Sequence, residues 1–442
     1  MQEPRLNDFD PRVRKAALEE LVARTEAEPG LLAPEIEAVN MHCHTFYSYN
    51  GWGYSPTALA WLGKRLGLQA MGIVDFDVLD GVDEFLDACE TVGLRGGTGL
   101  ETRVYVPEFA DREINSPGEP GVCYQMGLGF ATGQASGRAA EILSDLRQRA
   151  EHRNRGLLAR VNAHLRPAAI DYQTEVLPLT PSGNATERHM LTAYVAAAER
   201  AFPQASERAA FWADRLDVER TQVEALMEDV PAFKNVIRSK LMKRGGVGYV
   251  QPGPETFPSV DQLHEMVTLL GALPCFTWLD GTSAGESAIH ELLALMIDKG
   301  AAAVNIVPDR NWNIADPEVK AVKVDNLYQI VELALENDLP LNVGTEMNKL
   351  GLKRVDDFET PELAPVRQAF LDGAFFVYGH TVAQRALGIG YQSAWAQAEL
   401  PTRRERNTFY TELGRRVEPG FVGRNKLAAV PVGAPQAILA AL

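Results

Sequence analysis

The 442-residue chain is poor in cysteine and in positive charge, and it has no long apolar run. Its four cysteines are Cys43, Cys89, Cys123 and Cys275, and no two of them share a C-x-x-C spacing. This spacing argues against a redox pair or a disulfide framework. Three of the four lie in apolar, strand-like runs, which is typical of reduced core thiols in a cytoplasmic protein.

The charge balance is acidic, with 43 Lys and Arg against 59 Asp and Glu and a formal net charge of −16. Such a chain repels polyanions, so we expect neither an extended nucleic-acid surface nor binding to anionic membranes. The first residues lack the apolar core of a signal peptide, and no run is long enough to cross a bilayer. A small phosphorylated ligand stays compatible, because a bound metal ion can dominate the local field.

Strand-like and helix-like segments alternate from about residue 36. The apolar run 36–44 is followed by a helical pattern at 55–67, which begins with the capping pair Ser55-Pro56, and then by a second apolar run at 68–77. Repeats of this unit predict a parallel sheet covered by helices. Seven or eight such strands, the last expected in 374–381, predict an α/β fold that is a distorted (β/α)7–8 barrel.

One long stretch interrupts this alternation with an almost purely helical pattern rich in Ala, Arg and Glu. The expected organisation is an N-terminal helical extension (1–35), a barrel (36–134 and 250–390), a helical insertion (135–249) and a C-terminal tail (391–442).

The ends of the predicted strands carry the residues with most chemistry, as is usual in such barrels. In "VNMHCH", His42 and His44 share one face of a strand, and two imidazoles in this arrangement can reach one cation. The pair alone fits equally well a polar barrel interior with two hydrogen-bonded histidines. Acidic residues and one histidine recur at later strand ends and favour a site: Asp75, Asp77, Glu101, Asp280, Glu346 and His380.

The segments "HCHTFYSYNGWGYSP", "GLQAMGIVDFDVLDGVDEF" and "GLE" resemble the motifs of the polymerase and histidinol phosphatase (PHP) superfamily. "TERHMLTAYV", "KRGGVGYVQP", "LLGALPCFTW" and "LNVGTEMN" are similar to segments of its metal-dependent phosphoesterase branch, which has a helical insertion. The resemblance covers roughly residues 36–350. It implies a distorted barrel with up to three metal ions that hydrolyses phosphoesters through a metal-activated water.

The resemblance also implies a ligand set. His42 and His44 match the first ligand pair, Glu101 matches a bridging glutamate, and Glu346 stands where the family has an aspartate. These four could hold Zn²⁺, Mn²⁺ or Fe²⁺, and His189 could help Glu101 to bind a second ion. Other family ligands are missing, because Phe76, Trp278 and Asn348 occupy histidine positions and Tyr49-Asn50 replaces an aspartate. We therefore expect one or two divalent ions per chain.

A reduced metal site leaves the leaving group in need of another acid or cation. We consider Asp75 and His380 as catalytic groups at predicted strand ends, and Arg310 as a grip on a phosphate. The alternative for Arg310 is a surface ion pair. The arginines of the insertion, such as Arg153, could meet the substrate, although most of them read as a solvated helix face.

Three functions remain open. The first is a metal-dependent phosphoesterase acting on a small phosphorylated metabolite or nucleotide. The second is a hydrolase of other substrates, and the third is a non-catalytic barrel that binds a ligand or partner. The retained ligands favour an enzyme with a small-molecule substrate, whereas Phe76, Trp278 and Asn348 favour the third function or at least a changed substrate. The sequence leaves the substrate, the metal and the oligomeric state open.

Overall fold

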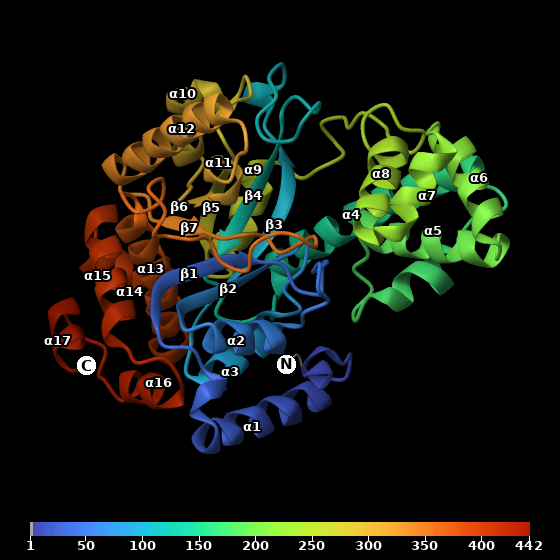
Figure 1. The fold of residues 1–442 in the computed structure, drawn as a ribbon. Helices are drawn as coiled ribbons and strands as arrows, with labels where there is room; N and C mark the ends of the chain where they lie inside the picture. Colours follow the sequence, from blue (N-terminus) through green and yellow to red (C-terminus); the bar gives the residue numbers. More distant parts are fainter. Residues whose placement is uncertain (1–2) are drawn as a thin grey trace.

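A computed structural model describes residues 3–442 and contains one mixed seven-stranded sheet that nearly closes into a barrel, with helices around it (Figure 1). The strands follow chain order around the sheet: β1 (Ile36–Cys43), β2 (Leu68–Phe76), β3 (Arg95–Tyr105), β4 (Val122–Leu128), β5 (Leu273–Trp278), β6 (Ala303–Ile306) and β7 (Leu341–Val343). The predicted distorted barrel with a helical insertion is confirmed.

Strand β4 breaks the parallel order, since it runs antiparallel to both β3 and β5. The link between β3 and β4, residues 106–121, contains only the short helix η3 (Pro107–Phe109). A longer helix is not needed because antiparallel neighbours require no helical crossover. The register places Glu101 opposite Met126 and Arg103 opposite Tyr124.

The barrel closes between β1 and β7 at an isolated bridge that joins Cys43 to Glu346. The N–H of His44 donates to the Glu346 carbonyl at 2.8 Å, and the N–H of Glu346 donates to the His42 carbonyl at 2.8 Å. A Cβ on Gly344 would lie 2.4 Å from the backbone nitrogen of His42, so glycine is required for this approach. The seam of the barrel therefore passes through the predicted ligand residues.

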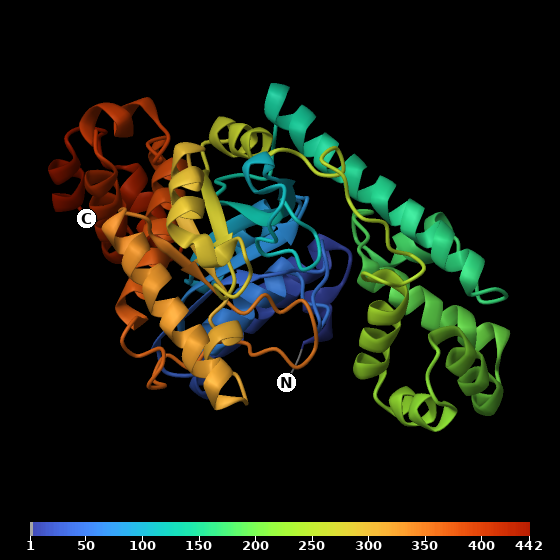
Figure 2. The same cartoon turned by 90° about the horizontal axis from the view of Figure 1, so that it is seen from above.

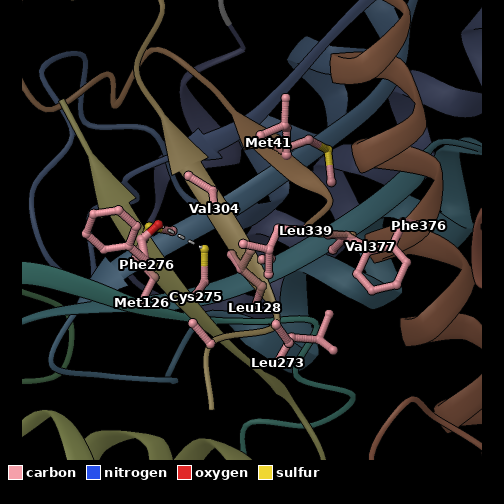
Figure 3. Packing of buried hydrophobic residues seen from close by; sticks show 14 of the residues in the cluster. Met41, Met126, Leu128, Leu273, Cys275, Phe276, Val304, Leu339, Phe376 and Val377 are labelled. Atoms are coloured by element: carbon pink, nitrogen blue, oxygen red, sulfur yellow. Dashed lines mark hydrogen bonds between the residues drawn. The ribbon is translucent and has the colours of Figure 1, made fainter. Parts of the chain in front are cut away.

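Helices cover the outside of the sheet. They are α2 (Pro56–Arg65), α3 (Val82–Val92), α9 (Val260–Leu269), α10 (Ile289–Asp298), the short α11 (Asp309–Trp312), α12 (Pro317–Glu336) and α13 (Arg367–Leu387). Ser55 caps α2 as expected, because its side chain accepts from the N–H of Ala58. Figure 3 shows buried residues of β4 and β5, among them Met126 and Phe276, in one cluster with Phe376 of α13.

The predicted strand at 374–381 is wrong, because these residues lie in the middle of α13. The helix packs between the sheet and α15 (Arg403–Arg416), and its glycines permit close contact. A Cβ on Gly379 would lie 1.9 Å from the Tyr410 carbonyl oxygen. A helix that is buried on most sides has a continuous apolar run, and periodicity alone cannot distinguish this run from a buried strand.

The residues outside the barrel are helical. The insertion contains α4 (Gly137–His164), α5 (Glu187–Ala201), α6 (Ala205–Leu216), α7 (Arg220–Glu228) and α8 (Val230–Met242), and it extends to one side of the barrel (Figure 2). It has its own apolar cluster around Tyr194 and Trp212. Helix α1 (Pro11–Ala27) precedes the barrel, and α14 (Ala394–Glu399), α15, α16 (Phe421–Ala428) and α17 (Pro435–Ala440) follow it. The domain boundaries given above stay a prediction.

Within residues 3–442, no helix has the length and apolarity needed to cross a membrane.

Candidate metal centre

Two strands bring His42, His44 and Glu101 together. The histidines lie at the end of β1, and Glu101 lies in β3 beside Phe76, the last residue of β2. The Oε2 atom of Glu101 is 3.7 Å from Nε2 of His42 and 3.4 Å from Nε2 of His44. All three side chains are buried, and one ligand atom from each lies within 4.8 Å of the others. This is the arrangement needed to hold one cation.

In each of the two histidines, Nδ1 has a hydrogen-bond partner and Nε2 has none among the described residues. Nδ1 of His42 lies 3.2 Å from Oδ1 of Asn305, and Nδ1 of His44 lies 3.2 Å from Oγ of Ser48. Both Nε2 atoms are buried and have no hydrogen-bond partner among residues 3–442. Buried polar atoms rarely stay unpartnered, and metal-binding imidazoles usually have their other nitrogen fixed by a hydrogen bond. The donor set therefore fits a metal ion.

The charges of the group also fit a cation. Burial by itself would raise the pKa of Glu101, but the imidazoles of His42 and His44 outweigh it and lower this pKa to about 2. Burial opposes protonation of His42, yet the carboxylates of Glu101 and Glu346 prevail and raise its pKa. The carboxylate of Glu101 is thus ionised, and it favours positive charge on His42. A bound metal ion would supply that charge in place of a proton.

Asp75 lies on the Nδ1 side of His44, away from the Nε2 atom that faces Glu101. Its carboxylate accepts hydrogen bonds from the N–H of Thr45 at 2.8 Å, from Oγ1 of Thr45 at 2.6 Å and from Oγ of Ser48 at 2.6 Å. Ser48 in turn contacts Nδ1 of His44. Burial raises the pKa of Asp75, although His44 and these donors oppose the shift. This arrangement suits a residue that orients His44, and the predicted catalytic role stays a prediction.

Glu346 and Arg310 are paired with each other. Glu346 follows β7 in a left-handed backbone conformation with φ 61°, and its carboxylate accepts from Nη2 of Arg310 at 3.1 and 3.3 Å. Asn348 donates to the same carboxylate at 3.3 Å. Burial would raise the pKa of Glu346, but Arg310 and then His42 lower it. Glu346 lies next to the three-residue group, and its predicted role as a ligand requires release from Arg310.

His189 caps α5 from within the insertion. Its Nδ1 accepts from the N–H of Thr186 at 3.0 Å, and its ring packs edge-on against Tyr49 at 5.2 Å. Burial lowers the pKa of His189 to about 4, so the ring is neutral. The residue is thus close to the loop after β1, but it is not one of the three grouped ligands.

His380 does not lie at a strand end, and this prediction needs correction. It lies in α13, where Nε2 contacts the Gly129 carbonyl at 3.0 Å and Nδ1 accepts from the N–H of Tyr391 at 2.9 Å. Gly129 follows β4, whose carboxyl end lies at the opposite end of the barrel from those of β1 and β2. Both nitrogens are occupied, and burial lowers the pKa to about 4. His380 therefore serves the packing of α13.

The three residues that replace family histidines make packing or hydrogen-bond contacts. Phe76 stacks on His44 with ring centroids 4.4 Å apart, Trp278 is buried in the main core, and Asn348 binds Glu346. Sequence reasoning missed Asn305, which holds His42. The polar residue within the apolar strand "AVNI" was the available signal.

Comparison with known proteins gives a short sequence match and a similarity of fold. No family model matches the sequence. An error-prone DNA polymerase from Cutibacterium acnes is 33% identical over 75 residues, which are 17% of this chain and 7% of the polymerase. The chain thus matches only a small part of the length of that relative. An amidohydrolase structure from Chromobacterium violaceum, with sulfate bound, superposes with a TM-score of 0.50 at 14% identity over 76% of this chain and 96% of the other.

At 14% identity, the likeness to the amidohydrolase structure shows a shared fold. A protein from Bifidobacterium adolescentis, assigned as a metal-dependent phosphoesterase, has a TM-score of 0.46 at 18% identity and covers 76% of this chain and 98% of its own. In the nearly closed barrel of this chain, the buried group of His42, His44 and Glu101 lies at the carboxyl ends of β1 and β2, which is where barrel enzymes place their active sites.

Proposed function

We propose that the protein is a metal-dependent phosphoesterase that hydrolyses a small phosphorylated metabolite or nucleotide. One divalent ion, Zn²⁺, Mn²⁺ or Fe²⁺, would be held by His42, His44 and Glu101. The observation that carries the proposal is the pair of buried Nε2 atoms that face the Glu101 carboxylate without any other partner. Such an ion, when bound, polarises a phosphoryl oxygen and activates water. The four buried free thiols support the proposed cytoplasmic location.

A cluster of Arg and Lys side chains favours an anionic substrate. Where the insertion meets the barrel, the chain has five partly buried cations: Arg103, Arg153, Arg188, Arg238 and Lys243. Only Glu119 and Glu187 pair with members of this group within 4.0 Å among the described residues. In a chain with net charge −16, this local excess of positive charge favours a ligand that brings negative charge.

Arg188 is the member of this group best placed to meet a substrate. It stands at the start of α5, its guanidinium lies 5.7 Å from the ring centroid of Tyr49, and no carboxylate of residues 3–442 lies within 4.0 Å of it. Burial and the neighbouring Arg238 lower its pKa, so an anion beside it would remove an unfavourable interaction. We assign Arg188 and Arg310 to the phosphate oxygens. Phe76, stacked on His44, keeps water from one side of the site.

The test combines metal analysis with turnover of 4-nitrophenyl phosphate. The wild-type protein, reconstituted with Zn²⁺ or Mn²⁺, should hold about one ion per chain and hydrolyse the ester, whereas His42→Ala/His44→Ala should lose both properties. The matched control is His152→Ala/His290→Ala, which removes two exposed histidines. A wild-type protein without metal after reconstitution would overturn the proposal.

A second function is favoured by the pairing of Glu346 with Arg310 and by the stacking of Phe76 on His44. Both remove ligands, and a barrel of this kind could bind an anion without hydrolysing it. Stoichiometric metal without turnover of any phosphoester would support this second function over the first.

A further inference from the structure

Hydrolysis of a phosphoester of an ordinary alcohol needs a proton on the leaving oxygen, and the structure narrows the choice of donor. Asp75 is enclosed behind His44, His380 lies at the far end of the barrel, and Arg310 is bound to Glu346. We propose that Tyr124 is the catalytic general acid and donates its phenolic proton to the leaving oxygen. This proposal rests on the phosphoesterase function proposed above.

The sheet register places Tyr124 on the face of the metal group. Tyr124 on β4 is opposite Arg103 on β3, and Met126 is opposite Glu101. Paired residues share a face of the sheet, and so do residues two apart on one strand. Tyr124 therefore stands on the same face as Glu101, one pleat closer to the carboxyl end of β3. That end is also where the parallel strands β1 and β2 deliver His44 and Phe76.

Ring contacts connect Tyr124 to the same place. The Phe76 ring stacks on His44 on one side, and its centroid lies 6.4 Å from that of Tyr124. The backbone of Tyr124 is fixed as well, because its N–H donates to Oδ1 of Asn115 at 2.7 Å and Asn115 donates to the Thr277 carbonyl at 2.7 Å. Asn115 thus ties the end of β4 to β5, and the position of Tyr124 is well defined.

The hydroxyl of Tyr124 is available to a ligand, since it has no hydrogen-bond partner within the described part of the chain. Burial raises the pKa of Tyr124 while Arg103 opposes this shift, so the phenol carries its proton at neutral pH. Tyr124 and Arg310 lie within electrostatic reach of each other, because an ionised Tyr124 would raise the pKa of Arg310. The hydroxyl is therefore close to cations that can stabilise a phenolate once the proton has left.

The step balances as a hydrolysis. The oxygen of a water molecule forms a bond to phosphorus while the ester P–O bond breaks, and the electron pair of that bond goes to the leaving oxygen. The leaving oxygen takes the proton of Tyr124 and departs as an alcohol. The attacking water releases one proton, and this proton returns to the phenolate beside Arg103. The net reaction converts ester and water into alcohol and phosphate.

The test uses Tyr124→Phe, which removes only the hydroxyl, with Tyr328→Phe as matched control. Tyr328 lies in α12, where its hydroxyl donates to the Glu362 carbonyl. Each metal-reconstituted protein is assayed with 4-nitrophenyl phosphate, whose leaving group needs no proton, and with n-propyl phosphate, whose leaving group does. For Tyr124→Phe we expect kcat to fall by about 10²–10³-fold with the propyl ester and by less than about threefold with the nitrophenyl ester.

Two further readouts do not depend on turnover. The metal content and the affinity for inorganic phosphate, measured by calorimetry, should be the same in Tyr124→Phe and wild type. Equal losses with both esters, no loss with either, or loss of metal would overturn the assignment of Tyr124. A wild-type protein that hydrolyses neither ester would instead overturn the phosphoesterase proposal itself, and the role of Tyr124 with it.

Discussion

Asp75 gives the sharpest test of how the metal centre is held in place. Its carboxylate accepts three hydrogen bonds from Thr45 and Ser48, and Ser48 contacts Nδ1 of His44. Asp75→Ala removes both acceptor oxygens and all three hydrogen bonds, so the loop loses its anchor and the His44 ring loses its fixed orientation. Asp75→Asn keeps the shape of the side chain and one acceptor oxygen but removes the charge.

The magnitudes follow from these contacts. A buried donor without an acceptor costs about 1–3 kcal/mol, and the hydroxyls of Thr45 and Ser48 can rotate to other acceptors whereas the N–H of Thr45 cannot. We expect Asp75→Ala to lower the free energy of unfolding by about 3 kcal/mol. Loss of a residue that orients a metal ligand typically weakens metal binding by about 10–100-fold. We expect the loss of metal affinity to fall within this range for Asp75→Ala, and at the lower end of the range or below it for Asp75→Asn.

The assay is competition for Zn²⁺ against a chromophoric chelator, together with denaturant unfolding of the metal-free protein. Asp75→Ala with the metal affinity of wild type would refute the claim that Asp75 orients His44. Asp75→Asn with full metal content but without turnover would show that Asp75 takes part in the chemistry, as its position in the sequence first suggested.

Two more predictions concern stability. Arg14→Met should lower the free energy of unfolding by about 3 kcal/mol, because the fully buried Arg14 pairs with Glu84; denaturant unfolding should show a smaller loss for Arg14→Met/Glu84→Gln, and equal losses would contradict the pairing. Asp356→Asn should be more stable than wild type at pH 8 but not at pH 4. Burial raises the pKa of Asp356 to about 7, so wild type loses up to about 4 kcal/mol between pH 4 and pH 7. Thermal unfolding at the two pH values measures this difference, and a gain of the same size at both would contradict it.

Much of the barrel could be predicted because its strands are short apolar runs separated by helical patterns. His42 and His44 are two residues apart at the end of β1, and the strand period of two places both imidazoles on one side of the sheet. Glu101 is predicted from its place in the strand-like run "GTGLET" and from its match to the glutamate of the PHP motifs. The positions of these residues follow from short-range strand patterns, which can be recognised in the sequence without knowledge of tertiary contacts.

The failures concern features that depend on packing between distant segments. The run 374–381 looks like a strand until α15 is placed against it. The pairing of Glu346 with Arg310 brings together two strand ends that no local pattern relates. Tyr124 is recognisable only from the register of β4 against β3, because an antiparallel strand within a parallel series exposes a different set of residues at the mouth of the barrel.

The seam between β1 and β7 couples the shape of the barrel to its ligand occupancy. The two amides that close it belong to His44 and Glu346, and the carbonyl that one of them meets belongs to His42. A cation that binds only when His42 and His44 are held in place would stabilise the closed seam by RT ln(1 + [M]/Kd), which is about 2.7 kcal/mol at a hundredfold excess over Kd. Hydrogen exchange at these two amides would then report metal binding directly, and the closure between β1 and β7 would depend on the occupancy of the candidate metal site.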